Sequence, residues 1–123
     1  VGDEPLLLET SWLPWSACRG LERLDLEYRS LYAVLEAEFG HRLAEARQTI
    51  EAAAAGIGDA ALLGIAPGAP VLLVEGVART DAGRPMEAFT AIYRADRVRL
   101  GLSSRRETFG PGATERAVSL VMR

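Results

Sequence analysis

The sequence predicts one domain of the α+β class, in which strands and helices share a core. Its 123 residues are enough for one domain, and 49% hydrophobic and 25% charged residues are shares typical of an ordinary globular protein. Two apolar runs on either side of the turn-like residues 81–84 predict a hairpin. Apolar side chains that recur at spacings of three and four predict a helix over residues 25–39.

The N-terminal run 5–14 is expected to be extended, because Pro5 can open a strand and the following side chains alternate. One face of this strand then carries Leu6, Leu8, Thr10 and Trp12. The other face carries Leu7, Glu9, Ser11 and Leu13. Residues 15–23 are typical of a loop.

The strongest helix signal lies in residues 25–39. Asp25 is placed to cap this helix and Gly40 to end it. The apolar stripe of the helix consists of Tyr28, Leu31, Tyr32, Leu35 and Phe39. Such a stripe indicates a face packed into the core rather than a cofactor site.

The next segments are less distinct. Residues 41–55 fit a helix by their alanine content and a strand by their alternation, and periodicity does not decide between the two. Residues 59–63 are typical of a short capped helix that leads into a turn rich in proline and glycine.

The hairpin is expected to pair residues 71–80 with residues 85–94. With the shortest turn, the predicted pairs are Thr80 with Pro85, Ala78 with Glu87, Gly76 with Phe89, and Val74 with Ala91. Small residues opposite a carboxylate and an aromatic ring leave space, so Gly76, Ala78 and Phe89 are predicted to line a pocket beside Glu87. Alternatively, Glu87 faces solvent and Gly76 only marks a bulge.

Several classes of function are disfavoured. The net charge is −3, and the arginines are scattered except around residues 94–106, so the chain is not expected to bind nucleic acid by itself. One cysteine, Cys18, excludes an internal disulfide and favours the cytoplasm. Cys18 and the single histidine, His41, are too few for a zinc site. No apolar run is long enough for a membrane helix, and no signal peptide is visible.

Residues 62–100 resemble a known protein family. The run "LLGIAPGAPVLLVEGVARTDAGRPMEAFTAIYRADRVRL" resembles the end of the UTRA domain, the effector-binding domain of HutC-type regulators in the GntR family of bacterial transcription factors. The residues that match the family pattern are Gly83, Pro85, Glu87, Tyr93, Arg94, Asp96 and Arg97. Ala95 replaces a usual glycine, and Val98 and Leu100 replace usual aromatic residues. The resemblance covers about residues 1–100, with residues 101–123 as a tail.

The resemblance implies a chorismate-lyase-like fold, an antiparallel sheet with helices packed on it, in which residues 41–55 form a strand. It implies ligand-binding roles for Glu9, Glu87 and Tyr93, and a hydroxyl that helps to hold a phosphate at Ser30. Arg94, Asp96 and Arg97 are then expected to form a structural corner, with Asp96 paired to an arginine. The family's first strands and its winged helix-turn-helix are absent, so the chain is expected to be a piece of a longer protein.

Three functions follow as hypotheses. The first is a cytoplasmic, homodimeric effector sensor of a transcriptional regulator, which binds a small anionic metabolite such as a sugar phosphate and needs no cofactor or metal. Contact with DNA would be made only through the absent domain. The second is a small lyase that uses Glu9 and Glu87 as acid and base, although the sequence shows no nucleophile, metal site or activated histidine beside them, so no catalytic residue is expected. The third is a dimerisation module without a ligand.

Beyond Leu100, residues 101–112 are typical of a loop and residues 117–123 of one more short strand.

Overall fold

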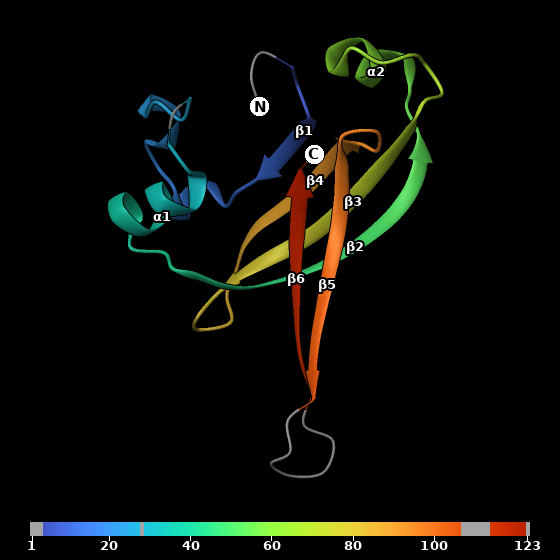
Figure 1. Ribbon diagram of the computed structural model, residues 1–123. Coiled ribbons are helices and arrows are strands. Elements are labelled where there is room, and N and C mark those ends of the chain that lie inside the picture. Colours follow the sequence, from blue (N-terminus) through green and yellow to red (C-terminus); the bar gives the residue numbers. More distant parts are fainter. Residues whose placement is uncertain (1–3, 28, 107–113, 123) are drawn as a thin grey trace.

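The computed structural model describes residues 4–27, 29–106 and 114–122, and its strands and helices follow the predicted α+β class (Figure 1). In chain order the elements are β1 (Leu7–Trp12), two 3₁₀ turns (Trp15–Ala17 and Leu21–Arg23), α1 (Leu31–Phe39), β2 (Leu43–Ala54), α2 (Ile57–Leu63), β3 (Pro70–Thr80), β4 (Pro85–Arg94), β5 (Val98–Arg106) and β6 (Thr114–Met122). Four strands form one antiparallel sheet in the order β1-β4-β3-β2, and β5 pairs with β6.

The central hairpin has the predicted register over most of its length. Ala78 lies opposite Glu87, and the pairs toward the open end follow as expected. The predicted pairing of Thr80 with Pro85 is wrong, because an irregularity after Ala78 brings Arg79 opposite Pro85. Thr80 instead closes the turn, where its backbone N–H donates to the carbonyl of Arg84 at 2.8 Å.

Helix α1 begins later than the sequence suggests. The expected cap, Asp25, accepts a hydrogen bond from the backbone N–H of Glu27 at 2.9 Å, a local turn that competes with helix formation. Ser30 is the residue that caps α1, and its hydroxyl accepts from the N–H of Ala33. Gly40 ends the helix in the left-handed conformation, as predicted. Tyr28, expected in the apolar stripe, lies outside the described residues.

The ambiguous segment 41–55 contains a strand. Strand β2 pairs with β3 along nearly its whole length, with Ala46 opposite Ala78 and Ile50 opposite Val74. Sheet pairing therefore outweighs the helix propensity of its alanines, as the family resemblance implied.

Helix α2 begins at Ile57, earlier than the predicted Asp59. Its N-cap is Gly56, which offers no side-chain cap, and Asp59 lies in the first turn. A carboxylate in that turn interacts favourably with the positive end of the helix dipole. Asp59 therefore helps to begin the helix without capping it.

The segment after Leu100 differs from the prediction. Residues 101–106 continue β5 instead of forming a loop, and β6 covers most of the expected last strand. The register places Leu100 opposite Leu120. Residue 100, where the resemblance ends, lies within β5.

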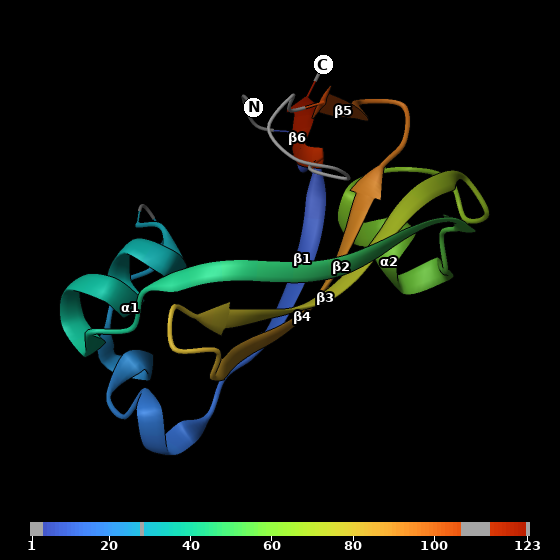
Figure 2. The ribbon, with the colours of Figure 1, turned by 90° about the horizontal axis from the view of Figure 1, so that it is seen from below.

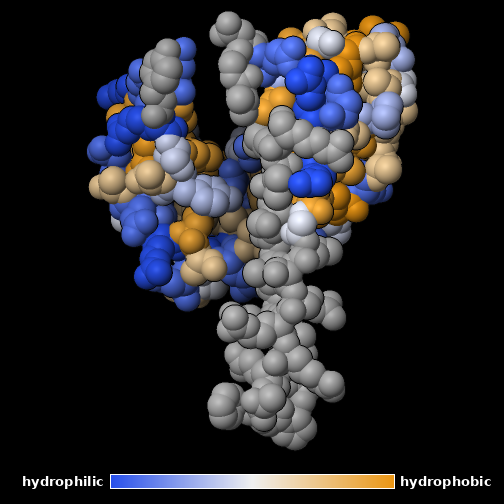
Figure 3. All heavy atoms as spheres, in the orientation of Figure 1, coloured by the Kyte–Doolittle hydropathy of each residue, from blue (hydrophilic) through white to orange (hydrophobic). Residues whose placement is uncertain are grey.

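Helices α1 and α2 lie at opposite ends of the sheet (Figures 1 and 2). Under α2, Leu63 and Val71 belong to one buried cluster, and under α1, Leu35 and Met86 belong to another. Apolar surface gathers at the α2 end (Figure 3), where Ile57 and Leu62 are exposed. A third buried cluster lies on the sheet itself and leads to the candidate site.

Candidate functional site

Strand β4 holds a buried carboxylate between apolar neighbours. The Glu87 side chain is only 3% exposed, and strand alternation places it on the same face as Phe89 and Ala91. The hydroxyl of Tyr32, on α1, donates a hydrogen bond to Oε1 of Glu87 at 2.7 Å. A buried charge needs such a partner, so Tyr32 stabilises Glu87 in the position that the hairpin gives it.

Glu9 and Tyr93 lie on the same face of the sheet as Glu87. The β1–β4 pairing places Glu9 opposite Ala91 and Leu7 opposite Tyr93. The Glu9 carboxyl loses part of its hydration among its neighbours, which raises its pKa, and the charge of Glu87 raises it further. Burial and then the charge of Glu9 raise the pKa of Tyr93. The three predicted ligand-binding residues of the sheet are therefore brought together.

Tyr32 is the member of this cluster that the sequence did not predict. It was assigned to the apolar stripe of the helix, yet it is 43% exposed and its hydroxyl contacts Glu87. Burial, the hydrogen bond to Glu87 and the charges of Glu87 and Glu9 raise the pKa of Tyr32. Tyr32 therefore stays protonated at neutral pH and remains a donor. A polar contact of Tyr32 could have been expected, because a partly buried tyrosine usually has a hydrogen-bond partner for its hydroxyl.

The space predicted above Gly76 is filled. A Cβ atom built on Gly76 would lie 2.6 Å from Cζ of Phe89 and 2.6 Å from the backbone oxygen of Arg47. The ring of Phe89 therefore packs directly over Gly76, which corrects the prediction that this glycine leaves open volume. Ala78, opposite Glu87, is buried.

Two hollows lie near the cluster. One of about 340 Å³ is lined by Glu87 together with Pro14, Pro85 and Met86, among others. A larger one of about 550 Å³ includes Gly76 and Phe89 in its lining but neither Glu9 nor Glu87. We place the candidate site at the carboxylates, because Glu87 is buried and hydrogen-bonded to Tyr32 and the pKa of Glu9 is raised, and such features identify a functional site better than volume does.

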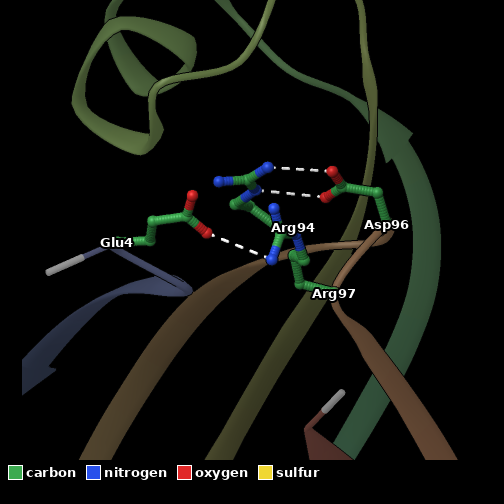
Figure 4. A network of polar contacts seen from close by, with 4 residues as sticks. All are labelled: Glu4, Arg94, Asp96 and Arg97. Carbon is green, nitrogen blue, oxygen red and sulfur yellow. Dashed lines mark hydrogen bonds and ion pairs between the residues drawn. The ribbon is translucent and has the colours of Figure 1, made fainter. Parts of the chain in front are cut away.

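The end of β4 forms a corner of ion pairs (Figure 4). Nε and Nη2 of Arg94 donate to the two carboxylate oxygens of Asp96 at 3.1 and 2.8 Å, so Asp96 does pair with an arginine. These hydrogen bonds are the main cause of the lowered pKa of Asp96. Arg97 contacts Glu4 at 3.1 Å, and the backbone N–H of Arg94 donates to the carbonyl of Leu6 at 3.0 Å. The corner therefore fixes β1 beside β4, and with it Glu9.

Ser30 has no hydrogen bond to either glutamate in the described residues. It is exposed at the N-terminus of α1, where its hydroxyl lies 3.5 Å from the N–H of Ala33. The first turn of α1 carries no acidic side chain.

The following findings hold for residues 4–27, 29–106 and 114–122, the part of the chain that the structure describes. That part contains no group of three or more metal-ligating side chains and no helix that could cross a membrane. Cys18 is buried, which raises the pKa of its thiol. The site therefore offers hydrogen-bond acceptors from Glu9 and Glu87 and hydroxyls from Tyr32 and Tyr93.

Comparison with known sequences agrees with the family resemblance that the sequence shows. The UTRA domain family matches residues 1–99. The HTH-type transcriptional regulator Rv0792c of Mycobacterium tuberculosis is 35% identical over 116 residues, which cover 92% of this chain and 43% of that protein. The HTH-type transcriptional repressor NagR of Bacillus subtilis is 32% identical over 97 residues, which cover 79% of this chain and 40% of that protein. The chain thus spans less than half the length of these relatives.

Solved structures agree with the sequence comparisons. A ligand-binding domain from Bordetella bronchiseptica, assigned to a GntR-family transcriptional regulator, superposes with a TM-score of 0.73 at 36% identity, over 78% of this chain and 63% of that one. The effector domain of PhnF from Mycobacterium smegmatis superposes with a TM-score of 0.72 at 29% identity, over 77% of this chain and 58% of that one. The sheet and its two helices therefore have close counterparts among transcriptional regulators.

Proposed function

We propose, because this chain belongs to the UTRA domain family, that it is the effector-sensing part of a DNA-binding transcriptional regulator of the GntR family, HutC subfamily, and acts in a repressor. Its relatives are transcriptional regulators and repressors, not enzymes. Contact with DNA then belongs to a winged helix-turn-helix elsewhere in the protein. The acidic balance of this chain fits that division of labour.

One observation supports ligand binding more than any other, namely the buried carboxylate of Glu87. A carboxylate has about four lone-pair positions, and Tyr32 fills one of those on Glu87. Burial of a charge is costly, so a strand that keeps one among apolar side chains is best explained by a use for it. Acceptance of hydrogen bonds from a ligand is that use.

The effector class follows from the groups around Glu87. Glu9 and Glu87 accept hydrogen bonds from hydroxyl or amino groups of the ligand, and Tyr93 stacks on it or donates to it. The N-terminus of α1, with Ser30, receives an anionic group. A small anionic metabolite with several hydroxyls, such as a sugar phosphate, carries both kinds of group.

The effector acts by a shift in population. The regulator is a cytoplasmic homodimer with more than one arrangement of its two copies, and the effector binds one arrangement more tightly. The linked DNA-binding domains then change their spacing. Without a difference in affinity between the arrangements, no shift would occur.

Isothermal titration of the intact protein tests the proposal. The panel contains sugar phosphates, the same sugars without phosphate, and amino sugars, and the variants are Glu87→Gln and, as a control, Glu36→Gln on the exposed side of α1. We expect one ligand to bind the wild type and the control equally and the Glu87 variant at least tenfold more weakly, since hydrogen bonds to charged groups contribute about 1.5–3 kcal/mol. Unchanged affinities in the Glu87 variant would remove Glu87 from the site.

A further inference from the structure

A further hollow, which we call the corner pocket, lies beside the ion pairs at the end of β4. It has a volume of about 340 Å³ and is lined by residues 64–66, 69 and 70, which follow α2, together with Arg94 and Asp96. Strand alternation places Arg94 and Tyr93 on opposite faces of β4, so the corner pocket lies across the sheet from Glu87. Its volume is in the range of pockets that bind small molecules.

Arg94 keeps hydrogen-bond donors that the ion pair does not use. A guanidinium carries five N–H groups in a fixed planar arrangement. Asp96 accepts two of them, one from Nε at 3.1 Å and one from Nη2 at 2.8 Å, and Figure 4 shows Nη1 on the side away from Asp96. One N–H of Nη1 and the remaining N–H of Nη2 point the same way. Together they form a second fork, which matches the two oxygens of a carboxylate.

Nη1 of Arg94 is accessible to a ligand although most of the side chain is buried. The Arg94 side chain is 11% exposed. Among the described residues, no fully buried side-chain nitrogen or oxygen lacks a hydrogen-bond partner, and Nη1 makes no hydrogen bond there, so Nη1 reaches solvent. Because Arg94 lines the corner pocket, a molecule in this pocket can meet the free N–H groups.

The charges nearby favour a ligand without a net charge. Asp96 already balances the charge of Arg94, so a simple carboxylate or a phosphate at the free fork would be repelled by Asp96. A ligand with an ammonium beside its carboxylate avoids this repulsion. The Asp96 side chain is 58% exposed at the rim of the pocket, and its carboxylate has lone-pair positions left for N–H donors. The lining residues Ile65 and Ala69 are apolar and half-buried.

We propose that the corner pocket binds a free α-amino acid with an apolar side chain. The carboxylate of the amino acid accepts two hydrogen bonds from the free fork of Arg94, and its ammonium donates to Asp96. Its side chain lies against Ile65 and Ala69. This second ligand site goes beyond the proposed function, because it shares no residue with the site at Glu87 and takes a ligand of a different class.

Isothermal titration of the intact protein tests the two charged contacts. The ligands are L-leucine, 4-methylpentanoate, which has the same carbon skeleton without the ammonium, and 3-methylbutylamine, which lacks the carboxylate. We expect L-leucine to bind roughly tenfold or more tightly than either analogue, because each analogue leaves one charged group of the pocket without its counterpart. Absence of L-leucine binding at millimolar concentrations, or equal binding of 4-methylpentanoate, would overturn the proposal.

Variants test the location, with circular dichroism to show that each one folds. Ala69→Leu fills the corner pocket without removing the ion pair, and Ala61→Leu on the exposed side of α2 is the matched control. We expect Ala69→Leu to bind L-leucine roughly tenfold or more weakly, and Ala61→Leu and Glu87→Gln to bind it as the wild type does. Asp96→Asn keeps an acceptor for Arg94 but loses the charge, so it should weaken binding of L-leucine and not of 4-methylpentanoate.

Two outcomes would contradict the location. Wild-type affinity for L-leucine in both Ala69→Leu and Asp96→Asn would show that the amino acid binds elsewhere. A loss of affinity in Glu87→Gln as large as that in Ala69→Leu would show that the two sites are not separate.

Discussion

The close packing of Phe89 over Gly76 predicts a large effect from the addition of one methyl group. In Gly76→Ala, the new Cβ atom would lie 2.6 Å from the backbone oxygen of Arg47 and 2.6 Å from Cζ of Phe89. A ring can rotate away, but a backbone oxygen of the neighbouring strand cannot move without its hydrogen-bonded ladder. Overpacking of this kind costs about 1–3 kcal/mol. At roughly 4 °C per kcal/mol, Tm should fall by about 4–12 °C.

Thermal unfolding followed by circular dichroism measures the effect, and Gly58→Ala is the matched control. No atom lies within 4 Å of a Cβ built on Gly58, and this residue is in α2, so the same substitution should stabilise the protein by up to about 1 kcal/mol. In a Phe89→Leu background, Gly76→Ala should cost less, because Cζ is gone, but it should still cost something. A Gly76→Ala protein as stable as the wild type would show that the strands do not approach this closely.

The hydrogen bond and the pKa shifts of the site give two further predictions. Tyr32→Phe leaves Glu87 without its donor, so the free energy of unfolding should fall by about 1–3 kcal/mol in urea titrations, whereas Tyr93→Phe, which lacks this contact, should change it less. The pKa of Glu9 is raised in the folded state, so the folded protein binds the proton of this carboxyl more tightly than the unfolded chain does. The contribution of Glu9 to the free energy of unfolding is therefore greatest below the ordinary pKa of 4.5, and it is lost as the pH rises through the folded pKa. Glu9→Gln should therefore gain stability relative to the wild type as the pH rises from 4.5 through the folded pKa of Glu9, and a difference that stays constant over this rise would contradict the raised pKa.

The register of the hairpin could be predicted because it depends on local features. Alternation fixes which residues share a face, and the turn fixes how the two strands meet, so the pairing of Ala78 with Glu87 followed from the sequence. The end of the hairpin could not be predicted. The irregularity after Ala78 depends on how Thr80 hydrogen-bonds within the turn, which several turn geometries allow.

Helix α1 shows why boundaries and contacts are harder to predict than elements. Asp25 and Ser30 are both good N-caps, but Asp25 accepts a hydrogen bond within a local turn, from the N–H of Glu27, and Ser30 caps the helix. The contact between Tyr32 and Glu87 joins residues 55 positions apart, so no local pattern contains it. The sequence placed Tyr32 on the correct face of the helix but could not show what its hydroxyl would reach.

Residues 101–106 were predicted as a loop because serine and arginine are weak strand signals without a known partner. Pairing with β6 supplies the missing backbone hydrogen bonds. Tertiary pairing similarly decided the state of residues 41–55. In both segments the strand that pairs with the segment lies too far along the sequence for local periodicity to reveal it.

The hydrogen bond from Tyr32 to Glu87 connects the proposed ligand site to α1, so a variant of Tyr32 can show how a ligand would act on this helix. A ligand that donates a hydrogen bond to Glu87 can act in two ways. It either displaces the hydroxyl of Tyr32 from the carboxylate, or it binds the carboxylate beside that hydroxyl. In the first case, α1 loses a polar contact with β4 when the ligand binds. In the second, the charge of Glu87 is shared among more donors and α1 is held more firmly. Tyr32→Phe distinguishes the two, because it should strengthen binding of a competing ligand and weaken binding of a cooperating one.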